Sequence, residues 1–201
     1  MKAKARMGAL HPNFIVGIGG SAGALTAYWA LLDALPPDTG MAFVIISHMS
    51  PSAYSQLALI LSRHTKMPVI VASQKMPILR NHVYVIPSDA DLTIENYTFK
   101  VLSPRVSRNK QIDLFFVSLA EAMGARAIGI VLSGYDGDGT EGCRQIKAKG
   151  GITFGQDMSA EVEYMPLSAQ VSGCIDFVMP IDKISDKLIS LNKPRKKSTN
   201  S

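Results

Sequence analysis

The chain has 201 residues, of which 47% are hydrophobic and 18% charged; this excludes a largely disordered chain and is typical of one globular domain. Its formal charge is +5, but seven basic side chains lie in the acid-free segments 1–10 and 191–201: Lys2, Lys4, Arg6, Lys193, Arg195, Lys196 and Lys197. The other 14 basic and all 16 acidic side chains give residues 11–190 a charge of about −2, which does not favour a nucleic-acid-binding domain.

The first half of the chain predicts alternating strands and helices. Short apolar runs are typical of strands buried on both faces of a parallel sheet, whereas apolar residues three and four apart are typical of helices. In chain order we predict strands at 14–19, 41–47, 67–72 and 82–87, helices over 22–35 and from Pro51, and a hairpin over 91–103.

The second half continues the alternation. We predict helices over 112–123, after the glycine-rich turn 136–142 and over 181–191, and strands at 125–134, 152–156 and 174–180. Short connections between these elements predict an α/β fold: a doubly wound, mostly parallel sheet with helices on both faces and a short antiparallel hairpin. We expect one domain at 13–191 between a basic tail at 1–12 and a basic, disordered tail at 192–201.

The cysteines and the N-terminal segment indicate the cellular compartment in which the protein is expected. Cys143 and Cys174 lack Cys-x-x-Cys spacing, so they predict neither a disulfide framework nor a zinc site, and we expect reduced core residues. The apolar run of segment 1–20 is short and interrupted by Pro12 and glycines, which excludes a signal peptide or a membrane span. We therefore expect a cytoplasmic protein.

Three polar residues stand just after predicted strands: Ser21, His48 and Asp138. In an open α/β sheet, ligands bind outside the carboxyl ends of the strands. A hydroxyl, an imidazole and a carboxylate at one edge are the parts of a serine-hydrolase triad, in which the base takes the serine proton and the acid orients the base. Taken alone, His48 is better explained as a histidine that closes a strand, and its place beside the Ser21 edge is what favours a catalytic role. The other histidines are not expected to be catalytic: His11, His64 and His82.

Ser21 lies in the segment GGSAG at 19–23, which fits the G-x-S-x-G pattern between a strand and a helix. Small neighbours allow a sharp turn that exposes the hydroxyl, and the following helix N-terminus offers N–H groups to an oxyanion. One alternative is a serine that only caps the helix. Another is a dinucleotide-binding turn, because 17–22 matches G-x-G-x-x-A, but that site requires an acid where this chain has His48.

The acid of the triad is not determined by spacing, because Asp136 and Asp138 share one turn. The turn also resembles a calcium-binding loop that starts at Asp136. We exclude that site because Glu141 stands where the loop requires glycine and Lys147 where it requires a bidentate glutamate.

Four ordered segments, IVGIGGSAGAL, FVIISHMSP, IGIVLSGYDGDGTEG and YMPLSA, resemble the catalytic domain of the chemotaxis protein-glutamate methylesterase family, CheB. The resemblance runs from about residue 14 to about residue 191 and is closest to the version that is fused to a methyltransferase. It implies that Ser21 is the nucleophile, His48 the base and Asp138, rather than Asp136, the acid.

The resemblance also implies an oxyanion and substrate pocket that includes Ala22, Tyr135 and Met165. Three positions depart from the common family pattern: Ala22 replaces a threonine, Tyr135 a methionine and Tyr164 a glycine. The first removes a hydroxyl beside the nucleophile, and the two tyrosines narrow the site. These departures therefore bear on substrate preference more than on the reaction.

The implied reaction is hydrolysis of glutamate γ-methyl esters on the helical cytoplasmic domains of chemoreceptors, with methanol as the product. The same steps on a side-chain amide would deamidate glutamine. Neither reaction needs a metal or another cofactor, and the implied partners are methyl-accepting chemotaxis receptors, not nucleic acid. Only about 13 residues precede the first predicted strand, so we expect no regulatory receiver domain in this chain and a separate regulator, or none.

Two other functions remain open. The first is an esterase of the same fold that acts on another acyl substrate. The departures from the family pattern at Ala22, Tyr135 and Tyr164 are consistent with this alternative. The second is a non-catalytic receptor-binding module that retains the triad residues without using them.

Overall fold

The computed structural model describes residues 10–48, 51–106 and 109–192. Its main sheet has seven parallel strands in the order β3-β4-β2-β1-β7-β8-β9. A separate antiparallel hairpin pairs β5 with β6. The strands are β1 Ile15–Gly20, β2 Ala42–Ser47, β3 Val69–Val71, β4 His82–Val85, β5 Asp91–Glu95, β6 Thr98–Leu102, β7 Ala127–Val131, β8 Ile152–Gln156 and β9 Phe177–Met179.

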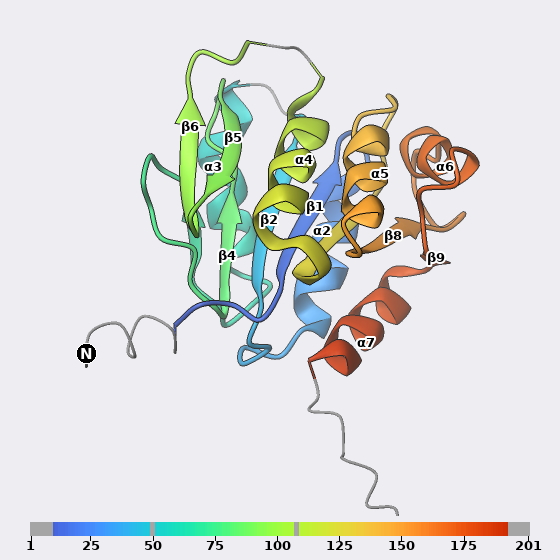
Figure 1. Ribbon diagram of the computed structural model, residues 1–201, viewed down its shortest axis with the longest axis horizontal. Helices are drawn as coiled ribbons and strands as arrows, with labels where there is room; N and C mark the ends of the chain where they lie inside the picture. Colours follow the sequence, from blue (N-terminus) through green and yellow to red (C-terminus); the bar gives the residue numbers. More distant parts are fainter. Residues whose placement is uncertain (1–9, 49–50, 107–108, 193–201) are drawn as a thin grey trace, which may run out of the picture.

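Helices cover both faces of the sheet (Figure 1). Helices α4, α5 and α6 and the hairpin share one apolar core with the sheet, and α2, α3 and α7 share the other. The helices are α2 Ala24–Ala34, α3 Pro51–Leu61, α4 Gln111–Met123, α5 Thr140–Ala148, α6 Tyr164–Val171 and α7 Ile181–Leu191, with a short 3₁₀ turn at Gly124–Arg126. The predicted doubly wound fold with a hairpin is therefore confirmed.

The central strands are completely buried, as their continuous apolar runs predicted. The main difference from the predicted elements is α6, which the sequence pattern did not reveal. Its apolar side chains point in two directions: Met165 and Ala169 are buried, while Tyr164, Leu167 and Val171 are exposed. Because apolar side chains lie on both sides of this eight-residue helix, the sequence shows no contrast between an apolar face and a polar face.

Glycines let helix α4 approach the sheet closely. A Cβ atom at Gly17 would lie 2.7 Å from the ring of Phe116, and one at Gly19 would lie 2.4 Å from Ile112. Both neighbours are fully buried in the core. The first turn of α4 therefore packs against the carboxyl end of β1, where the predicted site begins.

A crevice is expected where the chain leaves β1 and β7, because these adjacent strands lead to opposite faces. Helix α2 follows β1 onto one face of the sheet, and α5 follows β7 onto the other. Diverging connections of this kind form the ligand sites of open α/β sheets.

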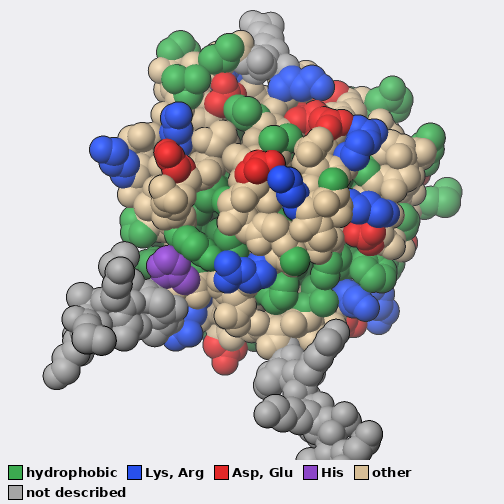
Figure 2. All heavy atoms as spheres, viewed as in Figure 1, with side chains coloured by type: hydrophobic (Ala, Val, Ile, Leu, Met, Phe, Trp, Pro, Cys, Tyr) green, Lys and Arg blue, Asp and Glu red, His purple; other side chains and the backbone are tan. Residues whose placement is uncertain are grey.

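Both cysteines are buried and free, which confirms their predicted place in the core. The predicted disordered tail lies outside the described residues, apart from Asn192. None of the helices in the described ranges has the length and apolar character of a membrane span. Acidic and basic side chains are interspersed on the face shown in Figure 2 and do not gather into one charged patch there.

Candidate active site

The three predicted residues lie at neighbouring strand ends. Strands β1 and β2 pair with Gly20 opposite Ser47, so Ser21 and His48 are the next residues on adjacent strands. The backbone N–H of His48 donates to Gly20 O at 3.3 Å, and that of Ser21 donates to Ser133 O at 2.9 Å. The backbone thereby fixes the β1, β2 and β7 connections at one edge of the sheet.

His48 contacts both aspartates between which the sequence could not choose. Its Nε2 lies 2.7 Å from Asp138 Oδ2, and its Nδ1 lies 3.1 Å from Asp136 Oδ2. The His48 side chain is 8% exposed, Asp138 is completely buried and Asp136 is 30% exposed. Ser21 Oγ, in contrast, makes no hydrogen bond to any residue that the structure describes.

The two carboxylates raise the pKa of His48 above its ordinary value of 6.5. Burial alone acts in the opposite direction, because it disfavours the charged ring. Hydrogen bonds and charge attraction from Asp138 and Asp136 together outweigh the burial effect. The arrangement therefore favours the imidazolium form.

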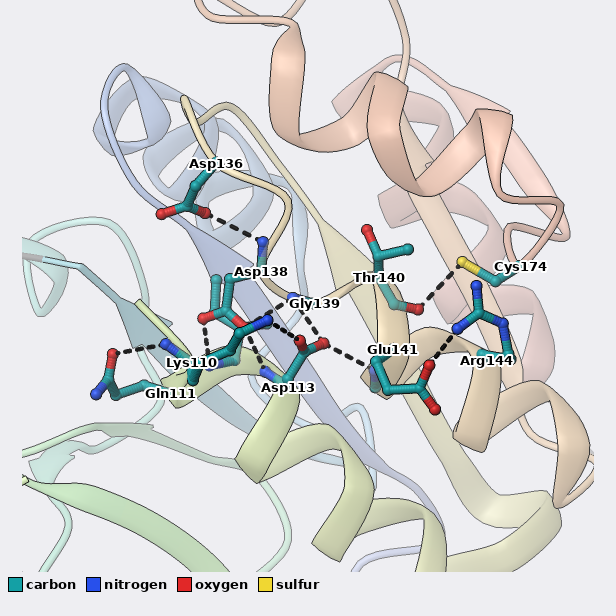
Figure 3. A network of polar contacts seen from close by, with 12 residues as sticks. Lys110, Gln111, Asp113, Asp136, Asp138, Gly139, Thr140, Glu141, Arg144 and Cys174 are labelled. Carbon is teal, nitrogen blue, oxygen red and sulfur yellow. Dashed lines mark hydrogen bonds and ion pairs between the residues drawn. The ribbon is translucent and has the colours of Figure 1, made fainter. Parts of the chain in front are cut away.

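Asp138 is held rigidly by the backbone around it (Figure 3). Its carboxylate accepts hydrogen bonds from the N–H groups of Ile112 at 2.9 Å and Asp113 at 2.8 Å, in the first turn of α4. It also accepts one from Gly139 N at 2.9 Å. The positive end of α4 and these donors suit an ionised carboxylate.

Asp113, in α4, makes the same kind of interaction with the start of α5. Its Oδ1 accepts hydrogen bonds from Gly139 N at 2.9 Å and Gly142 N at 2.8 Å, at the start of α5. Burial, partly opposed by the Gly142 hydrogen bond, raises the pKa of Asp113, and the nearby charge of Asp138 raises it further. Helices α4 and α5 are thus capped reciprocally, each by a carboxylate that lies on or just before the other.

The predicted pocket residues lie around Gly134. A Cβ atom at Gly134 would meet Met165 Cε at 2.5 Å and Ser21 Cβ at 3.1 Å, so these three residues are in close contact. Met165 N also donates to Gly134 O at 2.9 Å. Tyr135 is 72% exposed beside them. Among the described residues, the backbone N–H groups of Ala22 and Tyr135 have no hydrogen-bond acceptor.

The remaining histidines pair with residues elsewhere. His64 Nδ1 lies 3.0 Å from Asp33, and His82 Nδ1 lies 2.8 Å from Arg80 O. His11 packs edge-on against Tyr97. In the described part of the chain, no group of three His, Cys, Asp or Glu side chains is arranged to hold a metal ion.

Sequence reasoning missed two contributors to this site. Asp113 was read only as part of a helix, although an acid in a first turn is a familiar capping signal. The sequence offers Asp136 as an alternative to Asp138 and as the start of a rejected calcium-binding loop, whereas both aspartates contact the same ring. Only the path of the turn after β7 reveals that contact.

A parallel α/β sheet with a hydroxyl, an imidazole and carboxylates at its carboxyl edge has the architecture of a hydrolytic enzyme. The chain belongs to the CheB methylesterase family, because the family model matches residues 16–188. The crystal structure of the Thermotoga maritima CheB methylesterase catalytic domain is similar, with a TM-score of 0.82 and 28% identity. That likeness covers 89% of this chain and 98% of that chain.

Sequence relatives agree with this family. A Leptospira interrogans relative, whose name pairs protein-glutamate methylesterase with protein-glutamine glutaminase, is 32% identical over 88% of this chain and 93% of its own length. A Burkholderia pseudomallei protein-glutamate methylesterase/protein-glutamine glutaminase is 33% identical over 94% of this chain. This chain spans 56% of the Burkholderia protein and 49% of a similarly named Hydrogenovibrio crunogenus protein.

Proposed function

We propose that this chain is a serine hydrolase that removes methyl groups from glutamate γ-methyl esters on chemoreceptor cytoplasmic domains. The family and the names of its relatives support this activity, and also deamidation of glutamine in the same site. The observation that carries the proposal is the close approach of His48 Nε2 to the buried Asp138, 2.7 Å apart, at the strand end beside Ser21. Residues 13–191 form the catalytic domain in this proposal.

In this proposal the three residues take the roles of a serine-hydrolase triad. Asp138 orients His48 through Nε2, so Nδ1 is the ring nitrogen left to take the proton from Ser21. Ser21 Oγ attacks the ester carbonyl carbon, and a glutamyl ester of Ser21 forms as methanol leaves. Water then hydrolyses this ester, with His48 again acting as the base.

Ala22, Tyr135 and Met165 line the substrate pocket in this proposal. The N–H groups of Ala22 and Tyr135, which lack acceptors among the described residues, are suited to bind the oxyanion. Met165 is fully buried and packs against Gly134, so it supports the backbone beside Ser21 from beneath. The exposed ring of Tyr135 adds an apolar surface where a substrate helix would lie.

The test is methanol release from receptor membranes that a methyltransferase has labelled with radioactive methyl groups. We expect release by the wild-type chain and none above background by Ser21→Ala. Equal release by the two proteins would contradict the proposal. A fluorophosphonate probe separates the two remaining alternatives: Ser21-dependent labelling without methanol release indicates an esterase for another acyl substrate, and no labelling indicates a binding module.

A further inference from the structure

His48 has one carboxylate partner more than the proposed reaction uses. Asp138 lies on Nε2 and Asp136 on Nδ1. A ring that donates to carboxylates from both nitrogens carries both protons and has no lone pair for the serine proton. In that doubly protonated form His48 cannot act as a base.

The carboxylates of Asp138 and Asp136 differ in burial and in the number of hydrogen bonds that hold them. Asp138 is completely buried and accepts backbone hydrogen bonds from α4 and from Gly139. The Asp136 side chain is 30% exposed, and its one other hydrogen bond within the described residues comes from Asp138 N at 3.1 Å. Solvent can replace the contact of Asp136 with His48, whereas loss of Asp138 would leave buried donors unpaired.

We propose that Asp136 is a positioning residue that occupies Nδ1 of protonated His48, so that this nitrogen is not available to Ser21, and releases the ring once Nδ1 loses its proton. The inference rests on the proposed function. After release, Nδ1 accepts the proton of Ser21 Oγ while Oγ bonds to the carbonyl carbon and an electron pair moves onto the carbonyl oxygen. When the tetrahedral intermediate collapses, the proton on Nδ1 passes to the departing methoxide and methanol is formed.

Among the charged groups around His48, Asp136 is the one whose contact with the ring can change without loss of a helix cap. In the described part of the chain, the groups that face the ring are Asp136 and Asp138, and behind Asp138 lie Asp113 and Lys110 at the start of α4. Asp138 and Asp113 cap helices, and Lys110 pairs with Asp113 at 3.4 Å. Asp136 alone among the three acids caps neither helix.

The first test follows the protonation of His48 directly. The chain has four histidines, so the ring signal of His48 in an NMR titration is assigned by its loss in His48→Gln. Asp136→Asn keeps the shape of the side chain and removes its charge. We expect the titration midpoint of His48 to fall by about one pH unit, and Asp136→Glu to return it toward the wild-type value.

The second test measures kcat/KM against pH with p-nitrophenyl acetate as the probe. Because only the neutral ring accepts the serine proton, the acidic limb of the profile reports the protonation of His48. We expect this limb to move to lower pH in Asp136→Asn by the same amount as the NMR midpoint. A purely structural role would change the rate at every pH without moving the limb.

Asp186→Asn, which removes an exposed charge on α7, is the matched control and should change neither measurement. An unchanged or raised NMR midpoint in Asp136→Asn would overturn the inference. A lowered midpoint with an unmoved kinetic limb would overturn the role of Asp136 in hydrolysis. If methylated receptor membranes give no Ser21-dependent methanol release, the proposed function fails, and the NMR titration still decides whether Asp136 controls His48.

Discussion

The side chains of Ser21 and Asp138 differ in how much they contribute to the stability of the fold. The Ser21 hydroxyl has no hydrogen bond among the described residues, whereas the Asp138 carboxylate joins His48 to the backbone of two helices. A side chain that only reacts can be removed without loss of stability. One that also satisfies buried backbone donors cannot.

This difference predicts opposite behaviour in two substitutions. Ser21→Ala should lower ester hydrolysis by about four orders of magnitude or more, and change the free energy of unfolding by less than about 0.5 kcal/mol. Asp138→Ala should lower hydrolysis less, but destabilise the protein by about 2–4 kcal/mol, because the buried N–H groups of Ile112 and Asp113 lose their acceptor.

Urea unfolding and p-nitrophenyl acetate hydrolysis, measured on the same samples, check both values. Asp136→Ala serves as the control for the second substitution, since Asp136 caps neither helix and should cost little stability. Equal destabilisation by the two aspartate substitutions would show that Asp138 does not hold α4 and α5 together.

At the scale of elements, the turn from β1 into α2 depends on Gly23. Gly23 has a φ of +74°, which L-residues with a side chain rarely adopt. A Cβ atom there would also lie 2.6 Å from Ser133 Oγ. That hydroxyl donates to Ala22 O and accepts from Val162 N, so it connects the Ser21 turn to the segment before α6.

Gly173 provides a matched comparison, because its φ is +73° and a Cβ atom there would meet nothing within 4 Å. We expect Gly173→Ala to cost about 1 kcal/mol from the backbone conformation alone. Gly23→Ala should cost about 1–3 kcal/mol more, from the steric conflict with Ser133, and should also lower ester hydrolysis. Thermal or urea unfolding of the two variants checks the difference, and equal losses would contradict it.

Much of this architecture was predictable because local patterns and tertiary packing agree. Buried parallel strands require continuous apolar runs, and glycine turns separate them from helices, so both halves of the sheet were recognised. Helix α6 was not, because it is only eight residues long and its apolar residues lie on both sides: Met165 and Ala169 are buried, and Tyr164, Leu167 and Val171 are exposed. The placement of Ser21 and His48 at adjacent strand ends followed from the predicted strand boundaries. The Asp136 and Asp113 contacts depend on how α4 docks beside the β7 turn, which no local pattern encodes.

For the whole molecule, the distribution of charge separates residues 1–10 and 191–201 from residues 11–190. Residues 11–190 carry a charge of about −2, and the seven basic residues without acidic neighbours lie in 1–10 and 191–201. None of the side chains that form the candidate site belongs to those two segments. Catalysis on a small substrate and attraction to an anionic surface should therefore be separable.

Deletion of residues 1–9 and 193–201 tests this separation. We expect kcat/KM for p-nitrophenyl acetate to stay within about twofold, while co-sedimentation with anionic phosphatidylserine vesicles decreases, because each basic residue near such a surface contributes about 1 kcal/mol. Neutral phosphatidylcholine vesicles are the control. A large loss of hydrolysis would show that the two ends contribute to the active site.

The reciprocal capping of α4 and α5 has a consequence for how sequences of this family are interpreted. Asp138 satisfies buried N–H groups of α4 and Gly139, so selection for a stable fold alone would preserve it in a chain that had lost its chemistry. An aspartate at this position is therefore weak evidence that a relative is active. Serine at position 21, which stabilises nothing through its hydroxyl among the described residues, is the informative marker, because only turnover would maintain it.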